Sequence, residues 1–170
     1  DTTDVDRFCD VVSALEPSFG GINLEDIKAP ECFEIEARLR NQMNIPVFHD
    51  DQHGTAIVVG AGMLNAVRLL GKELDEIKLV CSGAGAAAQA CLNMLKTLGV
   101  KQEHIIVCDQ HGVLRNGREG PMDKYKTQYA RDTELATLKE ALVGADVFLG
   151  LSVPGVIDQD DVANMADRPV

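Results

Sequence analysis

Hydrophobic and polar positions along the chain alternate between the 3.6-residue period of helices and short apolar runs typical of buried strands. Before residue 55 the pattern predicts helices over 4–14 and 30–43 and strands over 22–24 and 45–48. Beyond it strands and helices alternate, and the expected elements are helices 55–70, 86–98 and 133–143, strands 78–82, 105–109 and 147–151, and a last helix from about residue 158. This alternation indicates an α/β fold with a parallel sheet covered by helices on both faces.

Three further features of the pattern carry expectations. The segment 55–70 is apolar almost all round, which predicts a buried helix. Residues 110–132 are polar and predict an irregular loop with a short helix. Both ends look cut, because residues 4–14 open directly as a helix with no capping leader and the chain stops at Val170, where an apolar strand begins. We therefore expect a piece of a longer protein, truncated at both ends.

Composition and charge exclude several classes of function. The net charge is −11 and no basic stripe is present, so nucleic acid and anionic membranes are not expected as partners. No uninterrupted apolar run approaches the length of a membrane span, and the N-terminus is not a signal peptide. The five cysteines are odd in number and lie mostly among apolar residues, which indicates reduced core thiols in a cytoplasmic protein.

A glycine-alanine signature for dinucleotide binding follows the strand 78–82 directly and consists of Gly83, Ala84, Gly85, Ala86, Ala87 and Ala88. Gly83 would permit the tight turn, Gly85 would let the backbone approach a pyrophosphate, and Ala88 would allow close packing of helix on strand. Asp109 ends the next strand 21 residues after Ala88, where an acid takes the ribose hydroxyls of a dinucleotide. The parallel sheet is therefore predicted to be of the Rossmann type.

Two acidic doublets mark a candidate metal site. Glu25 and Asp26 follow one short strand, and Asp50 and Asp51 follow another. Strand ends are where open α/β sheets place their ligands, and hard oxygen donors without thiolate suit Mg²⁺ or Mn²⁺. A divalent ion would also remove the repulsion between adjacent carboxylates.

Other interpretations of the second doublet remain open. An Asp-Asp pair in a loop is often a solvated turn or a helix cap. The spacing of His49 and His53 mimics the two-histidine zinc helix of metallohydrolases, with Asp50 where the usual glutamate base would stand. That alternative needs a helix through 49–53, and Pro46 before it and Gly54 after it argue against one.

Four stretches, "FGGINLEDI", "IPVFHDDQHGTA", "VCSGAGAAA" and "GADVFLGLS", together resemble the bacterial malic enzymes, which oxidatively decarboxylate malate to pyruvate and CO₂. The resemblance runs over essentially all 170 residues. It implies that Glu25, Asp26 and Asp51 hold the metal and that Asp50 contacts the catalytic lysine. Residues 84–87 match the family's nucleotide-cradling turn. Residues 1–54 are then the metal-site segment with interdomain helices, and 55–170 an incomplete dinucleotide-binding domain.

The resemblance also implies what the chain lacks. In that family the tyrosine acid and the lysine base lie in a segment that would precede Asp1, and an asparagine that contacts substrate and nicotinamide follows the strand that starts at Pro169. We therefore expect the chain alone to be inactive and the intact enzyme to be a homo-oligomer acting on malate. Tyr125 and Tyr129 lie in the wrong block and are expected to be surface or packing residues. The rival hypothesis is a non-catalytic dinucleotide-binding module, which would need none of the four acids.

The preferred dinucleotide is expected to be NAD, with NADP as the alternative. Asp109 would accept hydrogen bonds from the adenosine ribose and repel a 2′-phosphate. His111, Arg115 and Arg118 follow in a loop that would make a phosphate clamp if it folded back. The residue directly after Asp109 is Gln110 and not an arginine, which favours NAD.

Overall fold

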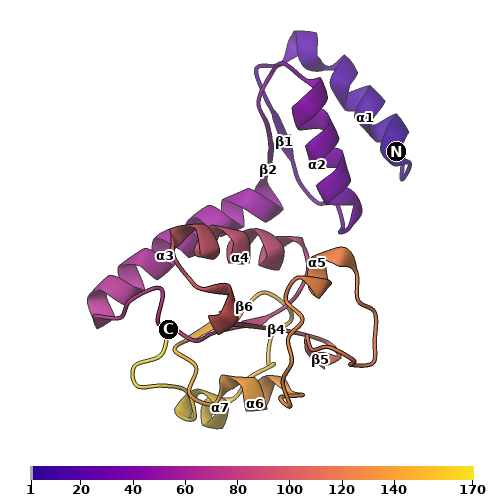
Figure 1. Cartoon of the computed structure of the whole chain (residues 1–170). Helices are drawn as coiled ribbons and strands as arrows, with labels where there is room; N and C mark the ends of the chain where they lie inside the picture. Colours follow the sequence, from indigo (N-terminus) through magenta and orange to yellow (C-terminus); the bar gives the residue numbers. More distant parts are fainter. Residues whose placement is uncertain (1) are drawn as a thin grey trace.

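The N-terminal part of the chain stands apart from the rest in Figure 1, and it folds around an apolar cluster of its own. The computed structural model describes residues 2–170. In this part the elements are helix α1 (Val5–Ala14), the 3₁₀ turn η1 (Glu16–Ser18), strand β1 (Ile22–Leu24), helix α2 (Glu31–Gln42) and strand β2 (Val47–His49). β1 and β2 run parallel, with Leu24 opposite His49, so both strands deliver their following residues to one edge.

The C-terminal part is built on a four-stranded sheet in the order β5-β4-β3-β6. Its strands are β3 (Leu79–Ser82), β4 (Ile105–Asp109), β5 (Gly112–Val113) and β6 (Val147–Gly150). β3 pairs in parallel with both β4 and β6, and β5 forms a short antiparallel hairpin with β4. The chain passes from β3 to β4 on one side and later places β6 on the other. The strand order therefore reverses at β3, which creates a crevice between the ends of β3 and β6.

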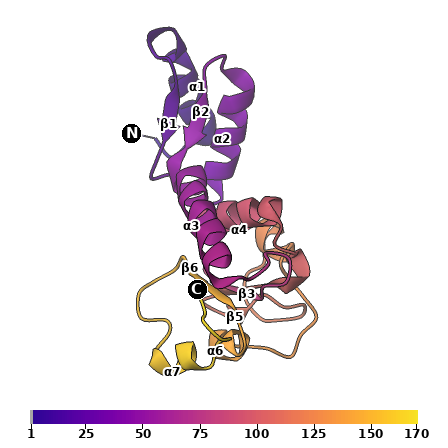
Figure 2. The same cartoon turned by 90° about the vertical axis from the view of Figure 1, so that its left-hand side faces the viewer.

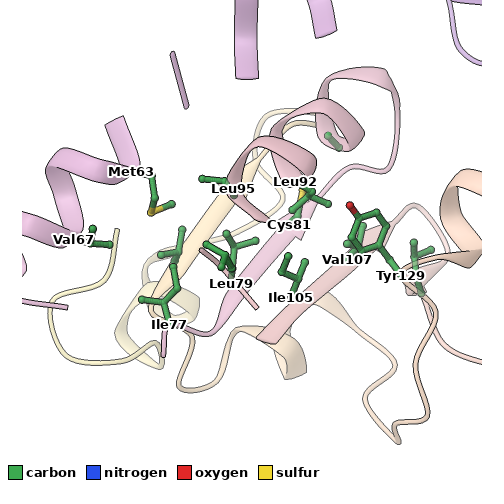
Figure 3. Close-up of a cluster of buried hydrophobic side chains, with 14 residues drawn as sticks. Met63, Val67, Ile77, Leu79, Cys81, Leu92, Leu95, Ile105, Val107 and Tyr129 are labelled. Atoms are coloured by element: carbon green, nitrogen blue, oxygen red, sulfur yellow. The ribbon is translucent and has the colours of Figure 1, made fainter. Parts of the chain in front are cut away.

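Helices cover both faces of this sheet, as the alternation of strands and helices predicted (Figures 1 and 2). One face carries α3 (Thr55–Leu70) and α4 (Ala86–Leu98), whose Met63, Leu92 and Leu95 meet alternate strand residues (Figure 3). The other face is covered by α6 (Leu138–Leu142). The Rossmann-type expectation is confirmed. The remaining elements are the π turn η2 (Asp50–Gly54), the 3₁₀ turn η3 (Gln102–His104), α5 (Lys124–Thr127) and α7 (Gln159–Ala163).

Helix α3 is apolar almost all round, yet it is buried along one side only. Its inward side packs closely on α4, because Gly60 lies where an added Cβ would come within 3.1 Å of Met94 Cγ. On the other side Val58 is 72% exposed and Leu69 is 84% exposed. The expectation of a fully buried helix was therefore wrong. Within residues 2–170, α4 and the adjoining strands reach only one face of α3.

One helical segment among the described residues, Asp50–Leu70, is long and apolar enough to cross a membrane when judged by length and composition alone. Asp50, Asp51, Asn65 and Arg68 interrupt this segment, so it is not an uninterrupted apolar run. A single such helix is weak evidence, because core helices of soluble proteins meet the same criteria.

Several local details differ from the sequence expectation. Asp4 does cap α1, since its carboxylate accepts a hydrogen bond from the Arg7 amide at 2.8 Å. The helix expected over 133–143 is shorter, because it begins only after the Thr137 capping box. All five cysteines are buried and free, and burial raises the pKa of the Cys81 thiol to about 12. Their expected role as reduced core thiols is confirmed.

Candidate functional site

The turn after β3 forms the floor of the crevice at the sheet's reversal point. Gly83 has φ +121°, and a Cβ at this position would collide with the carbonyl oxygen of Leu151, which follows β6. A glycine is therefore needed both for the backbone angle and for the close approach of the two strand ends. Across the same crevice the hydroxyls of Ser82 and Ser152 lie 2.8 Å apart. The role predicted for Gly83 as the tight-turn glycine fits this geometry.

The N-terminus of α4 faces this turn with uncapped amides. Gly85 stands at the N-cap position and, because it has no side chain, leaves the first amides of α4 uncapped. A Cβ on Gly85 would meet no protein atom within 4 Å, so open space lies beside the backbone here. The free amides and the dipole of a 13-residue helix suit the pyrophosphate of a dinucleotide. Ala88 is buried against the sheet, as expected for the packing position of the signature.

A cleft of about 620 Å³ opens above this turn and spans both parts of the chain. Its lining includes Gly83–Gly85 and Asp109 from the C-terminal part and Phe33 from α2. The Phe33 and Tyr125 rings pack at 4.2 Å between centroids and join α2 to α5. Tyr129, in contrast, is buried in the core beneath α4 (Figure 3). Both tyrosines are packing residues, as predicted, and Tyr125 also lines the cleft.

Asp109 lies at the end of β4, where the sequence placed it, and two cations hold its carboxylate. Arg118 approaches both oxygens at 2.7 Å, and the Lys126 ammonium lies 2.8 Å from Oδ2. The Asp109 and Arg118 side chains are only 8% and 3% exposed. Burial raises the pKa of Asp109, but hydrogen bonds from Arg118, Lys126 and the His111 amide lower it more, so this pKa lies well below its usual range.

This ion cluster changes the basis for judging cofactor preference. Arg118 does fold back, as the clamp alternative required, but it binds Asp109 itself. Arg115 instead lies in a backbone bridge with Arg131. Lys126 was missed by the sequence analysis because it stands 17 residues after Asp109 in an irregular loop. The charge of Asp109 is compensated, so it does not by itself repel a 2′-phosphate.

The two acidic doublets meet at the paired ends of β1 and β2. The Asp51 carboxylate accepts a 2.8 Å hydrogen bond from the Asp26 amide, although 25 residues separate them. Asp26 has φ +58°, a left-handed backbone angle that places its amide toward Asp51. Glu25 Oε1 accepts a 2.6 Å hydrogen bond from Asn23. The contact between the Asp26 amide and the Asp51 carboxylate therefore joins the two doublets through the backbone of one and the side chain of the other.

The donor chemistry of this edge fits a hard divalent cation. Within residues 2–170, no lysine or arginine pairs with Glu25, Asp26, Asp50 or Asp51, so the four carboxylates lack a balancing charge. The described residues do not, however, bring three such side chains into a cluster ready to hold a metal. The three-carboxylate metal site therefore remains a prediction.

Residues Asp50–Gly54 form a single π turn that runs straight into α3. Such turns are rare and often occur at functional sites. A Cβ on Gly54 would collide with Asp50 Oδ1, so the Asp50 carboxylate lies directly against the Gly54 backbone. Pro46 and Gly54 were expected to argue against a helix through 49–53, and the π turn over Asp50–Gly54 corrects this in part. It also packs against α4, the helix whose N-terminus faces the crevice.

The metallohydrolase alternative is contradicted by this geometry. His49 is the last residue of β2 and lies outside the turn. His53 Nε2 is instead 2.6 Å from Glu36 Oε1 on α2, a contact that ties the turn to the N-terminal part. The two imidazoles therefore do not stand one helical turn apart on a single helix, as a zinc pair would require.

Comparison with known proteins identifies the family. The family model "Malic enzyme, NAD binding domain" matches residues 52–170, and "Malic enzyme, N-terminal domain" matches residues 1–40. An NAD-dependent malic enzyme of Rhizobium meliloti is 58% identical over the whole chain, and an NADP-dependent malic enzyme of the same organism is 55% identical. The chain spans 22% of the length of each of these two proteins.

The structural comparison agrees. The crystal structure of the NAD-dependent malic enzyme from Thermotoga maritima superimposes with a TM-score of 0.91 at 41% sequence identity. The match covers 99% of this chain and 46% of that one. An ornithine carbamoyltransferase from Thermus thermophilus, at 17% identity and a TM-score of 0.62, shares the fold alone. The family models match both parts of the chain, and they agree with the signature turn at the sheet's reversal point and with the adjoining acidic strand ends. The chain therefore belongs to the malic enzyme family.

Proposed function

We propose that the protein to which this chain belongs oxidatively decarboxylates malate to pyruvate and CO₂ while reducing NAD or NADP. The observation that carries the proposal is the contact between the Asp26 amide and the Asp51 carboxylate. It joins the two acidic doublets beside a π turn that packs on the dinucleotide-facing helix α4. A module that only bound a dinucleotide would have no need of this acidic edge.

In this proposal Glu25, Asp26 and Asp51 hold one Mg²⁺ or Mn²⁺. When bound, the ion supplies a Lewis acid that polarises the carbonyl oxygen formed at C2, and the dinucleotide supplies the hydride acceptor. The carboxylates fix the position of that charge at the paired ends of β1 and β2. Asp50, held against Gly54, provides a negative charge for the catalytic lysine that the family resemblance implies elsewhere in the enzyme.

The dinucleotide is bound by backbone in the crevice between β3 and β6. The turn Gly83, Ala84, Gly85, Ala86, Ala87 and Ala88 offers the free amides of α4 to the pyrophosphate. The Gly83 backbone angle sets the direction of the turn, and the open space at Gly85 admits the phosphates. Asp109 stands at the ribose end of the same cleft.

Discrimination between NAD and NADP rests in this proposal on Lys126. Arg118 and Lys126 both contact Asp109, and the three side chains together carry a net charge of +1. Of the two cations, Lys126 lines the cleft, whereas Arg118 is almost fully buried. Its ammonium would contact a 2′-phosphate, so the cluster accepts NADP beside NAD. The NAD-dependent and the NADP-dependent malic enzyme of Rhizobium meliloti are similarly identical to this chain, at 58% and 55%.

The wider expectations are part of the same proposal. Residues 1–54 carry the metal ligands and 55–170 the dinucleotide site, which fits the separate apolar clusters of the two parts. The acidic net charge disfavours nucleic acid or an anionic membrane as partner, and the substrate proposed is the small molecule malate. Cytoplasmic location and homo-oligomeric assembly are proposed for the full-length enzyme; five free buried thiols support the former.

The test is a product balance on the full-length protein with Mn²⁺. The proposal predicts that each malate consumed yields one reduced dinucleotide, one pyruvate and one CO₂. Accumulation of oxaloacetate without CO₂ would show a simple dehydrogenase. Tight dinucleotide binding with no malate turnover would instead support the non-catalytic module.

A further inference from the structure

His49 is a buried histidine whose ring nitrogens find no hydrogen-bond partner among the residues that the structure describes. It is the last residue of β2 and its side chain is 0% exposed. Neither Nδ1 nor Nε2 makes a hydrogen bond within residues 2–170. An imidazole always carries at least one N–H donor, and leaving such a group unpaired in the interior costs free energy. A buried imidazole without a partner therefore indicates that one of its ring nitrogens gains a hydrogen-bond partner in another state of the protein.

The carboxylate of Asp51 lies close to the ring. His49 Nδ1 lies 4.0 Å from Asp51 Oδ2, the same oxygen that accepts the Asp26 amide. A hydrogen bond needs about 2.7–3.2 Å, so a movement of roughly 1 Å by the half-exposed carboxylate would close it. Asp51 sits on the π turn directly after β2, whereas His49 is fixed within the strand by its pairing with Leu24.

We propose that His49 is a positioning residue that orients the Asp51 carboxylate for metal binding through an Nδ1–H donor. The inference rests on the proposed function, in which Asp51 is a metal ligand. Asp51 then has one oxygen held by the Asp26 amide and the His49 ring and leaves its other oxygen for the ion. Carboxylates that bind metals are commonly held by a second hydrogen-bonding group of this type, and loss of that group weakens metal binding.

A packing role alone would not require either nitrogen. His49 faces inward on the same side of β2 as Val47, which belongs to the apolar cluster of the N-terminal part. An apolar ring would satisfy that surface without leaving a buried donor unpaired. The distinguishing property is therefore the donor at Nδ1, and the test must separate it from ring volume and from Nε2.

The experiment compares His49→Asn with His49→Gln in the full-length protein. The asparagine amide reaches about as far as Nδ1, and the glutamine amide about as far as Nε2, so both variants are polar but only one restores the donor toward Asp51. Mn²⁺ binding is measured by the electron paramagnetic resonance signal of free Mn²⁺, without malate or dinucleotide. We expect His49→Gln to raise the Mn²⁺ dissociation constant about 10- to 100-fold and His49→Asn to stay within about threefold of the wild type.

A matched control comes from the other part of the chain. His104 also has a buried Nδ1 that has no partner in the described part of the chain, but it lies in η3, which leads into the opposite end of β4 from Asp109. His104→Gln should leave Mn²⁺ binding unchanged. Melting temperatures in chelator should agree among the three variants, which separates metal binding from folding.

The outcomes distinguish this inference from the proposed function. Equal Mn²⁺ affinity of His49→Gln and wild type, or equal weakening by the Asn and Gln variants, would overturn the role of Nδ1 and leave the metal site intact. Wild-type protein that binds no Mn²⁺ would overturn the proposed metal site and this inference together. Steady-state kinetics supply a second readout: the Gln variant should raise the apparent Mn²⁺ requirement far more than it lowers kcat at saturating metal.

Discussion

Replacement of Lys126 by glutamine should reduce the use of NADP selectively. The Lys126 side chain is 19% exposed, lines the dinucleotide cleft, and lies 2.8 Å from Asp109 Oδ2. Lys126→Gln changes the net charge of its cluster with Asp109 and Arg118 from +1 to zero, because the Asp109–Arg118 pair remains. A 2′-phosphate would then lose its attraction, whereas a 2′-hydroxyl loses little.

The size of the effect follows from the exposure of the site. Two unit charges 4 Å apart interact by about 1 kcal/mol in water and about 4 kcal/mol at an effective dielectric constant of 20. An open cleft lies between these limits, and Asp109 already offsets part of the lysine charge. An expected loss of about 1.4–2.8 kcal/mol corresponds to roughly a 10- to 100-fold fall in kcat/KM for NADP.

The assay is steady-state malate oxidation by the full-length enzyme with each dinucleotide. Lys124→Gln is the matched control, because it removes the same charge two residues away, where the ammonium lies over the Tyr125 ring and outside the cleft lining. Equal falls for NAD and NADP in Lys126→Gln would refute the assignment. So would an NADP loss of the same size in Lys124→Gln.

Two further predictions concern the turn and the ion cluster. Gly83→Ala should lower the melting temperature and abolish dinucleotide binding, because its Cβ would collide with Leu151. Gly85→Ala should keep the melting temperature and only weaken dinucleotide binding, because open space lies beside Gly85. Equal losses of melting temperature in the two variants would contradict this. Asp109→Asn should cost about 3 kcal/mol in urea unfolding at pH 7, since it leaves Arg118 buried and unpaired. Because the pKa of Asp109 is depressed in the folded protein, its ion pair stabilises the fold fully above the unfolded pKa of about 3.9, and this stabilisation is lost as the pH falls further. The difference in unfolding free energy between wild type and variant should therefore shrink from pH 4 downward. A difference that stays constant with pH would contradict the pairing.

Much of the fold follows from local sequence. The strands 22–24 and 105–109 and the helix 86–98 have the bounds that apolar runs and terminal glycines predict. The helix at 55–70 also has its predicted bounds, but its burial was wrong. Periodicity reports which faces are apolar and not which of them another element covers. Gly71 does end that helix in the left-handed conformation expected of a C-cap.

Those residues of the site that directly follow a predicted strand could be placed from the sequence. Placing Asp26 beside Asp51 needs only the parallel pairing of two short strands. The partners of Asp109 could not be inferred, because Arg118 and Lys126 reach it from an irregular loop whose path no periodicity sets. The same holds for His49, since an unpaired buried nitrogen is a property of packing and leaves no mark in sequence.

The most direct test of the account is the position of the metal. Crystals of the full-length protein soaked with Mn²⁺ would be measured at a wavelength where manganese scatters anomalously. If Glu25, Asp26 and Asp51 hold the ion, one anomalous peak lies between their carboxylates, with oxygen–metal distances of about 2.0–2.2 Å. A peak between His53 and Glu36, or no peak at the paired ends of β1 and β2, would contradict it.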